Sequence, residues 1–237
     1  MRLRFPAALL TLLLLVNFAS EVPAAESVRY RFGLLRRGPG WTPERNAHTD
    51  SVQAGHMANI RRMAAAGALL SAGPFEDGGE YRGVFVFRPG DDNLDSLMAG
   101  DPAIASGWLV CEKSVWFAPA GLSDDYRARS ASGAPDSMTT FGWVFLRRGP
   151  RYDSNPSPSV LKLIERHQRY AEKLKARGQL VFSGAIEGTG DLRGILIFKG
   201  DKKSVERVMK GDPAVRAGRL VPQVLTWWTA VGAIPGH

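Results

Sequence analysis

The chain has 237 residues, with 31 Lys and Arg, 23 Asp and Glu and a formal net charge of +8 at pH 7. Apart from doublets such as Arg36 and Arg37, the basic residues are scattered, and this favours a solvated basic surface over a nucleic-acid-binding one. The single cysteine, Cys111, excludes an intramolecular disulfide.

The first 25 residues have the pattern of a secretory signal peptide. Arg2 and Arg4 precede an apolar run from Phe5 to Phe18, which is shorter than the ~20 residues that a membrane-spanning helix needs. We expect cleavage after Ala24 or Ala25, which predicts a periplasmic or secreted protein with no stable membrane insertion. An uncleaved anchor is the alternative.

The rest of the chain contains an internal duplication. The segment GDPAIASG at 100–107 recurs as GDPAVRAG at 211–218, and the offset of 111 residues holds without a gap from about residue 30 to residue 121. Each copy is long enough to form a core of its own. The duplication predicts three regions after the signal peptide at 1–25: a repeat at 26–120, a polar linker at 121–138 and a second repeat at 139–232.

The pattern of apolar residues predicts four strands and two helices in each repeat. Apolar residues alternate with other residues at 29–34 and again from residue 141, which is typical of a strand. A helix with apolar spacings of three and four follows and ends at Gly67 or Gly178. The remaining elements are two strands, a short helix and a last strand: 68–75, 83–88, 92–99 and 107–117 in the first copy, and 179–186, 194–199, 202–210 and 218–228 in the second.

This order of elements predicts an α+β fold. Each repeat is expected to form a ferredoxin-like βαββαβ unit with both helices on one face of its sheet. The other face of such a sheet is apolar and needs a partner. We therefore expect the two tandem repeats to pair sheet to sheet as an intramolecular pseudo-dimer, a pseudo-dimeric α+β barrel.

Polar residues that occur in both copies are the candidates for a functional site. They form six pairs: Arg36/Arg147, Arg37/Arg148, His56/His167, Glu76/Glu187, Arg82/Arg193 and Asp101/Asp212. The pairs include no serine, threonine or cysteine, which argues against a covalent nucleophile. The chain has no CxxC, HExxH or GxGxxG motif and only one such histidine per copy, so we expect neither a metal nor a cofactor.

His56 and His167 fall on the apolar face of the first helix in each copy, where a polar side chain needs a partner. Each is either a core histidine bonded to a backbone carbonyl or a general acid or base. Asp101 and Asp212 each precede a proline, so each is the N-cap of a short helix, a residue that orients the histidine, or both. We take these four as candidate catalytic residues.

Arg37 and Arg148 lie where the first strand of each copy ends. A guanidinium at that place is suited to an anionic small-molecule ligand, so both are candidate ligand-binding residues. A solvated loop is the alternative.

These features resemble a known family. They comprise the inward histidine, a Gly-x-Leu turn at 67–69 and 178–180, a strand that ends in Gly73 or Gly184, and Asp-Pro with a following glycine at 101–107 and 212–218. Together they are similar to YCII-related (YciI-like) proteins over both repeats. The resemblance implies a dimeric α+β barrel of the muconolactone isomerase-like kind and an enzymatic role for His56 with Asp101 and for His167 with Asp212. The chain departs from that family in its tandem fusion, its export signal and Ala185 in place of a proline.

Two hypotheses for the function follow. The first is an exported, cofactor-free enzyme of the isomerase, lyase or hydrolase type, in which the histidine is the general acid or base and the aspartate fixes its tautomer. The second is a non-catalytic module that binds a small-molecule ligand or has a structural role. The absence of a third catalytic group from the six pairs supports the second hypothesis.

Overall fold

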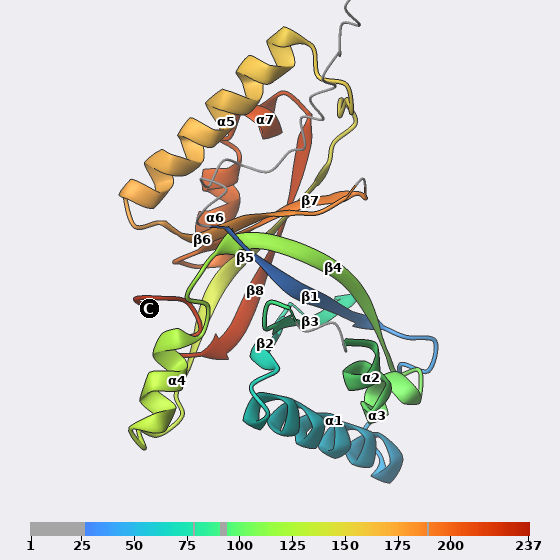
Figure 1. The fold of residues 1–237 in the computed structure, drawn as a ribbon. Coiled ribbons are helices and arrows are strands. Elements are labelled where there is room, and N and C mark those ends of the chain that lie inside the picture. The colour runs from blue at the N-terminus through green and yellow to red at the C-terminus, as the bar shows by residue number, and fades with distance from the viewer. Residues whose placement is uncertain (1–26, 78, 91–93, 189) are drawn as a thin grey trace, which may run out of the picture.

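A computed structural model of the chain describes residues 27–77, 79–90, 94–188 and 190–237 (Figure 1). The predicted signal peptide lies outside these residues, so it and the predicted localisation stay predictions. The first half contains β1 (Ser27–Arg37), α1 (Ala47–Ala65), β2 (Leu69–Pro74), β3 (Tyr81–Phe87), α2 (Leu94–Ala99), α3 (Pro102–Ala105) and β4 (Leu109–Pro119). After α4 (Asp124–Ala131), the second half contains β5 (Met138–Arg148), α5 (Pro158–Ala176), β6 (Leu180–Ile186), β7 (Leu192–Phe198), α6 (Lys202–Met209), α7 (Pro213–Arg216) and β8 (Leu220–Ala230).

The strands form one antiparallel sheet of eight, in the order β2-β3-β1-β4-β6-β7-β5-β8. In its middle, β4 pairs with β6 through Trp116 and Ile186. The outer strands β2 and β8 also approach each other, since Phe75 and Trp227 form a bridge and the amide of Glu76 donates to the carbonyl of Thr226 at 3.0 Å. The sheet is therefore nearly closed, and the predicted α+β class is confirmed.

The inside of this near-barrel is filled by aromatic side chains. Trp116, Trp143 and Trp227 are fully buried, and the rings of Trp143 and Trp227 meet edge to face at 4.9 Å between centroids. Two glycines let the strands approach closely at the two junctions. A Cβ atom on Gly73 would lie 2.1 Å from the carbonyl oxygen of Trp228, and one on Gly184 would lie 2.1 Å from that of Phe117. Only glycine fits at such a distance.

The helices cover the outside of the sheet, with α1, α2 and α3 over the first half and α5, α6 and α7 over the second (Figure 1). Both long helices end where the sequence predicts. Ser157 caps α5 by accepting from the amide of Val160, and Gly67 and Gly178 have positive φ angles of 69° and 65° after the last turns. None of the helices in the described ranges is both long and apolar enough to span a membrane.

The stretch predicted as a linker, 121–138, contains the helix α4. Its side chains are polar and none is buried, so no apolar periodicity marked it in the sequence. The segment is held by its N-terminal end: Leu122 is buried, and the amides of Ser123 and Tyr126 donate to carbonyls of Ala233 and Gly232 near the C-terminus. Backbone bonds to the chain end therefore order a segment that composition alone marks as a linker.

Candidate functional site

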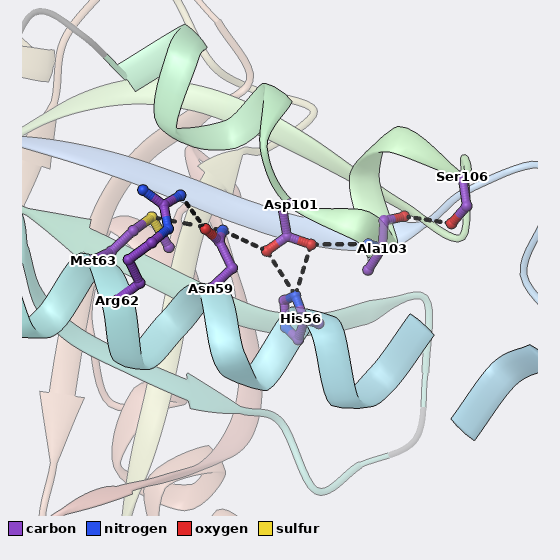
Figure 2. A network of polar contacts seen from close by, with 7 residues as sticks. All are labelled: His56, Asn59, Arg62, Met63, Asp101, Ala103 and Ser106. Carbon is purple, nitrogen blue, oxygen red and sulfur yellow. Dashed lines mark hydrogen bonds and ion pairs between the residues drawn. The ribbon is translucent and has the colours of Figure 1, made fainter. Parts of the chain in front are cut away.

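The structure brings His56 of α1 together with Asp101 at the start of α3 (Figure 2). Nδ1 of His56 lies 3.0 and 2.9 Å from the two carboxylate oxygens of Asp101. The same carboxylate caps α3, because it accepts from the amide of Ala103 at 2.9 Å. Asp101 is therefore a helix cap and a histidine partner at the same time.

Asn59 joins this pair and was missed by the sequence analysis. Its amide nitrogen donates to Asp101 at 3.0 Å, and its carbonyl oxygen accepts from Arg62 (Figure 2). Asn59 lies three residues after His56, so it shares the buried face of the helix. It was overlooked because its counterpart in the second repeat is Tyr170 and the search kept only residues common to both copies.

The environment of Asp101 favours its ionised form. Burial alone would raise the pKa of this carboxyl group. The hydrogen bond and the charge of His56, together with the hydrogen bonds from Asn59 and Ala103, outweigh burial and hold the pKa of Asp101 below its ordinary value.

The second repeat contains an equivalent pair. Nδ1 of His167 lies 2.7 Å from a carboxylate oxygen of Asp212. The other oxygen of Asp212 caps α7 by accepting from the amides of Ala214 and Val215 at 2.7 and 3.3 Å. Tyr170 stands where Asn59 stands in the first repeat, and its hydroxyl donates to the carbonyl of Val208 at 2.8 Å instead of reaching the aspartate.

The two histidines differ in how their helices are covered. Helix α1 buries five residues: Thr49, Val52, His56, Asn59 and Met63. Helix α5 has the stronger apolar stripe but buries only Leu174. In the N-terminal half of α5, residues of the apolar stripe such as Leu163, Ile164 and His167 are partly exposed. The second repeat therefore presents an apolar face that its own chain does not fully cover.

Two substitutions explain the difference. Gly55 faces α3 so closely that a Cβ atom would lie 2.8 Å from Cγ of Pro102, whereas the second repeat has Arg166 at this position. The ring of His56 packs on Phe85 with 5.8 Å between centroids, and the counterpart of Phe85 is the smaller Leu196. The side chain of His56 is 9% exposed and that of His167 is 14% exposed, so the second histidine is slightly more open.

The candidate ligand-binding arginines both lie on aromatic rings of the loop that follows the first strand. The guanidinium of Arg37 lies 5.3 Å from the ring centroid of Trp41, and that of Arg148 lies 4.6 Å from that of Tyr152. The sequence did not single out these two aromatic residues, because they differ between the copies.

Two cavities of about 290 and 470 Å³ lie along the β4–β6 junction. Their linings are rich in charged side chains such as Lys113, Arg147 and Glu187, and the described residues that line them include no histidine, cysteine, methionine or tyrosine. In the described ranges, no group of three or more His, Cys, Asp or Glu side chains is arranged to hold a metal ion.

Comparisons with known proteins relate the chain to others only through its fold. No protein-family model matches the sequence, and no curated protein matches it either. Among solved structures, a mutant chlorite dismutase from Candidatus Nitrospira defluvii has a TM-score of 0.53 at 10% identity and covers 92% of this chain and 94% of its own. A novel heme-binding protein from Thermus thermophilus has a TM-score of 0.52 at 15% identity, with coverage of 86% and 91%. The chain thus shares a fold with these proteins.

These findings correct the family predicted from the sequence. The assignment to the YCII-related family, and to the muconolactone isomerase-like dimeric α+β barrels with it, is wrong, because no family model matches and the similar folds are of the chlorite dismutase kind. The prediction of a cofactor-free His-Asp enzyme falls with it. The resemblance misled because Asp-Pro at 101–102 and 212–213 is a helix cap with proline in the first turn, an arrangement that many folds use.

Proposed function

We propose that the protein binds haem in its second repeat, with His167 as the ligand of the iron. The observation that carries the proposal is the combination of a histidine whose Nδ1 is held by Asp212 with a helix α5 whose apolar face is only partly covered. The fold supports it, since one of the similar structures is a heme-binding protein.

The donor atoms of the chain fit this ligand. Haem iron is bound in proteins by histidine, cysteine, methionine or tyrosine side chains. Burial raises the pKa of the Cys111 thiol to about 12, which keeps it protonated and unsuited to iron. His167 makes its hydrogen bond through Nδ1, which leaves Nε2 for a metal, and a carboxylate on the far nitrogen is the usual partner of a metal-bound histidine.

The space around the two histidines distinguishes the repeats. A flat macrocycle needs an apolar slot beside its axial ligand. The first repeat offers none, because His56 packs against Phe85 and α1 packs against Pro102 at Gly55. The second repeat has Arg166 and Leu196 at the positions of Gly55 and Phe85, and it leaves Leu163 and Ile164 of α5 partly exposed beside His167. These differences favour the second repeat over the first as the haem site.

Bound haem would supply redox chemistry at its iron. The role of the protein chain is to hold and tune the ligand. Asp212 accepts the Nδ1 proton of His167, so it fixes the tautomer, orients the ring and makes Nε2 a stronger donor. The amides of Ala214 and Val215 hold the carboxylate in turn. The apolar side chains of α5 would keep water away from the macrocycle.

The same proposal treats the eight strands as two ferredoxin-like units, at 26–120 and 139–232, that pair as an intramolecular pseudo-dimer. The equivalent junctions support it. Between β4 and β6 the amide of Glu187 donates to the carbonyl of Val115 at 2.9 Å, and between β2 and β8 that of Glu76 donates to the carbonyl of Thr226 at 3.0 Å. Each residue of one bond lies 111 positions from its counterpart in the other.

A haem titration tests the proposal. Haem-free protein is titrated with haem while absorbance is followed in the Soret region, where ligation by histidine changes the spectrum. We expect saturation at one haem per chain, since only the second repeat fits. Saturation at two per chain would contradict the distinction between the repeats, and a spectrum without a saturable change would contradict haem binding altogether.

A further inference from the structure

Three guanidinium groups of the second repeat gather on one aromatic ring. The Cζ atoms of Arg148, Arg193 and Arg219 lie 4.6, 5.8 and 4.6 Å from the ring centroid of Tyr152. The turn after β5 fixes this arginine cluster, because the amide of Gly149 donates to the carbonyl of Arg219 at 2.8 Å and that of Tyr152 donates to Gly149 at 3.0 Å. The cluster is therefore built into the folded backbone.

The first repeat makes the same turn with different side chains. The amide of Gly38 donates to the carbonyl of Trp108 at 2.9 Å, and that of Trp41 donates to Gly38 at 3.0 Å. Trp108 occupies the position of Arg219 and stacks on Trp41 with 4.7 Å between centroids. In the described residues, the guanidinium groups of Arg37 and Arg82 lie over the ring of Trp41. The second repeat has thus exchanged an indole for a third positive charge.

Two N–H groups of the arginine cluster have no acceptor among the described residues. Nε of Arg148 and Nε of Arg193 are both buried without a hydrogen-bond partner, and in the described part of the chain neither arginine forms an ion pair with a carboxylate. Arg193 donates instead to the carbonyl of Gly188. Buried donors without acceptors are costly, so the arrangement favours an added acceptor.

Arg219 is only 2% exposed and donates to the backbone carbonyl of Asp153 at 2.8 Å. Burial lowers the pKa of Arg219; Tyr152 and Asp153 oppose that shift, and the charge of Arg193 adds to it. Asp153 is therefore an acidic neighbour of the cluster, and its single negative charge is smaller than the three positive charges of the arginines. The cluster keeps an excess of positive charge in a partly buried place, where an anion would be strongly attracted.

We propose that the arginine cluster binds an oxyanion, the phosphate or carboxylate group of a small molecule. Guanidinium groups present paired N–H donors that match the oxygens of such groups, and the Nε–H groups of Arg148 and Arg193 would gain the acceptor that they lack. The inference does not rest on haem binding, because none of the three arginines belongs to the histidine–aspartate pair.

Calorimetric titration of the haem-free full chain with inorganic phosphate and, separately, with succinate tests this inference at a fixed ionic strength set by chloride. We expect saturable binding of at least one of the two anions, weakened about tenfold by Arg193→Gln, since one charge-assisted hydrogen bond contributes roughly that much. Arg82→Gln makes the same change in the first repeat and should leave binding unchanged. Far-ultraviolet circular dichroism checks that both variants are folded.

Arg219→Trp is the second variant, because the first repeat already accommodates tryptophan at this position. It should also weaken anion binding about tenfold. Two results would overturn the proposal: no heat of binding for either anion beyond that of chloride, or an equal loss of affinity in Arg82→Gln and Arg193→Gln.

Discussion

The two repeats hold the same histidine–aspartate pair under helices that are packed differently. In each, the aspartate caps a short helix and bonds Nδ1 of the histidine. In the first repeat, Asn59 donates a further hydrogen bond to the aspartate, and α1 buries the pair. In the second repeat, Tyr170 bonds the carbonyl of Val208 instead, and α5 buries little of its apolar face. The comparison teaches that the same polar pair is held in two different surroundings, and the proposal of haem in the second repeat alone depends on that difference.

The largest effect is expected from removing the carboxylates. Asp101→Ala would leave the buried side chains of His56 and Asn59 without a partner and remove a helix cap, so we expect a loss of about 3 to 5 kcal/mol in the free energy of unfolding. Asp212→Ala should cost less, because none of the described side-chain amides donates to Asp212 and the side chain of His167 is slightly more exposed than that of His56. Urea denaturation measures both, and an equal or larger loss in Asp212→Ala would break the comparison.

The two junctions between the halves, β2 with β8 and β4 with β6, should be equally sensitive to an added side chain, whereas the two long helices should not. Gly73→Ala and Gly184→Ala each place a Cβ atom 2.1 Å from a backbone carbonyl oxygen, and we expect each to cost about 3 kcal/mol or more through forced separation of the strands. Gly79→Ala is the matched control, because a Cβ atom there would meet no atom within 4 Å. Thermal unfolding of the three variants tests this, and a stable Gly184→Ala protein would contradict the close junction.

A substitution at Gly55 tests how closely α1 packs against α3. Gly55→Ala places a Cβ atom 2.8 Å from Pro102, so α1 must shift away from α3, and we expect a loss of about 1 to 2 kcal/mol in the free energy of unfolding. Arg166→Ala at the equivalent position of α5 should be within about 0.5 kcal/mol of the wild type. Chemical denaturation separates the two. A destabilising Arg166→Ala would show that α5 is docked as tightly as α1.

A smaller effect is expected in the pH dependence of stability. The pKa of Asp101 in the folded protein lies below its ordinary value of 3.8, since the bonds from His56, Asn59 and Ala103 outweigh burial. The stabilisation is therefore complete above that ordinary pKa and is lost as the pH falls through it toward the lower folded value. Between about pH 5 and pH 2, the free energy of unfolding should fall less steeply in Asp101→Asn than in the wild type. Parallel slopes would show that Asp101 is not held ionised.

Much of the fold could be predicted from local patterns. The alternation around Tyr30 and Phe141 predicted the first strands, and the three-and-four spacing around His56 and His167 predicted the long helices, because these periods follow from backbone geometry alone. The pairing of β4 with β6 through Trp116 and Ile186 has no local signal. It depends on contacts between residues far apart in the chain, and a single sequence does not reveal those contacts.

The site was predicted only in part. The duplication identified His56, Asp101, His167 and Asp212 as residues that the structure then brings together in pairs. The same filter removed the residues that differ between copies, and these carry the contrast: Asn59 against Tyr170, and Trp108 against Arg219. The residues shared by the two copies form the histidine–aspartate pairs, and the residues that differ set the surroundings of each pair. A search for differences between the copies would have found Arg219.

The central claim is that one repeat binds haem and the other does not, and a matched pair of variants tests it most directly. Haem is titrated into His167→Ala and His56→Ala under the same conditions, with the Soret absorbance as readout. We predict that His167→Ala loses the change in spectrum that saturates in the wild type, and that His56→Ala keeps it at one haem per chain. If His56→Ala loses the change in spectrum and His167→Ala keeps it, or if both variants bind like the wild type, the account is contradicted.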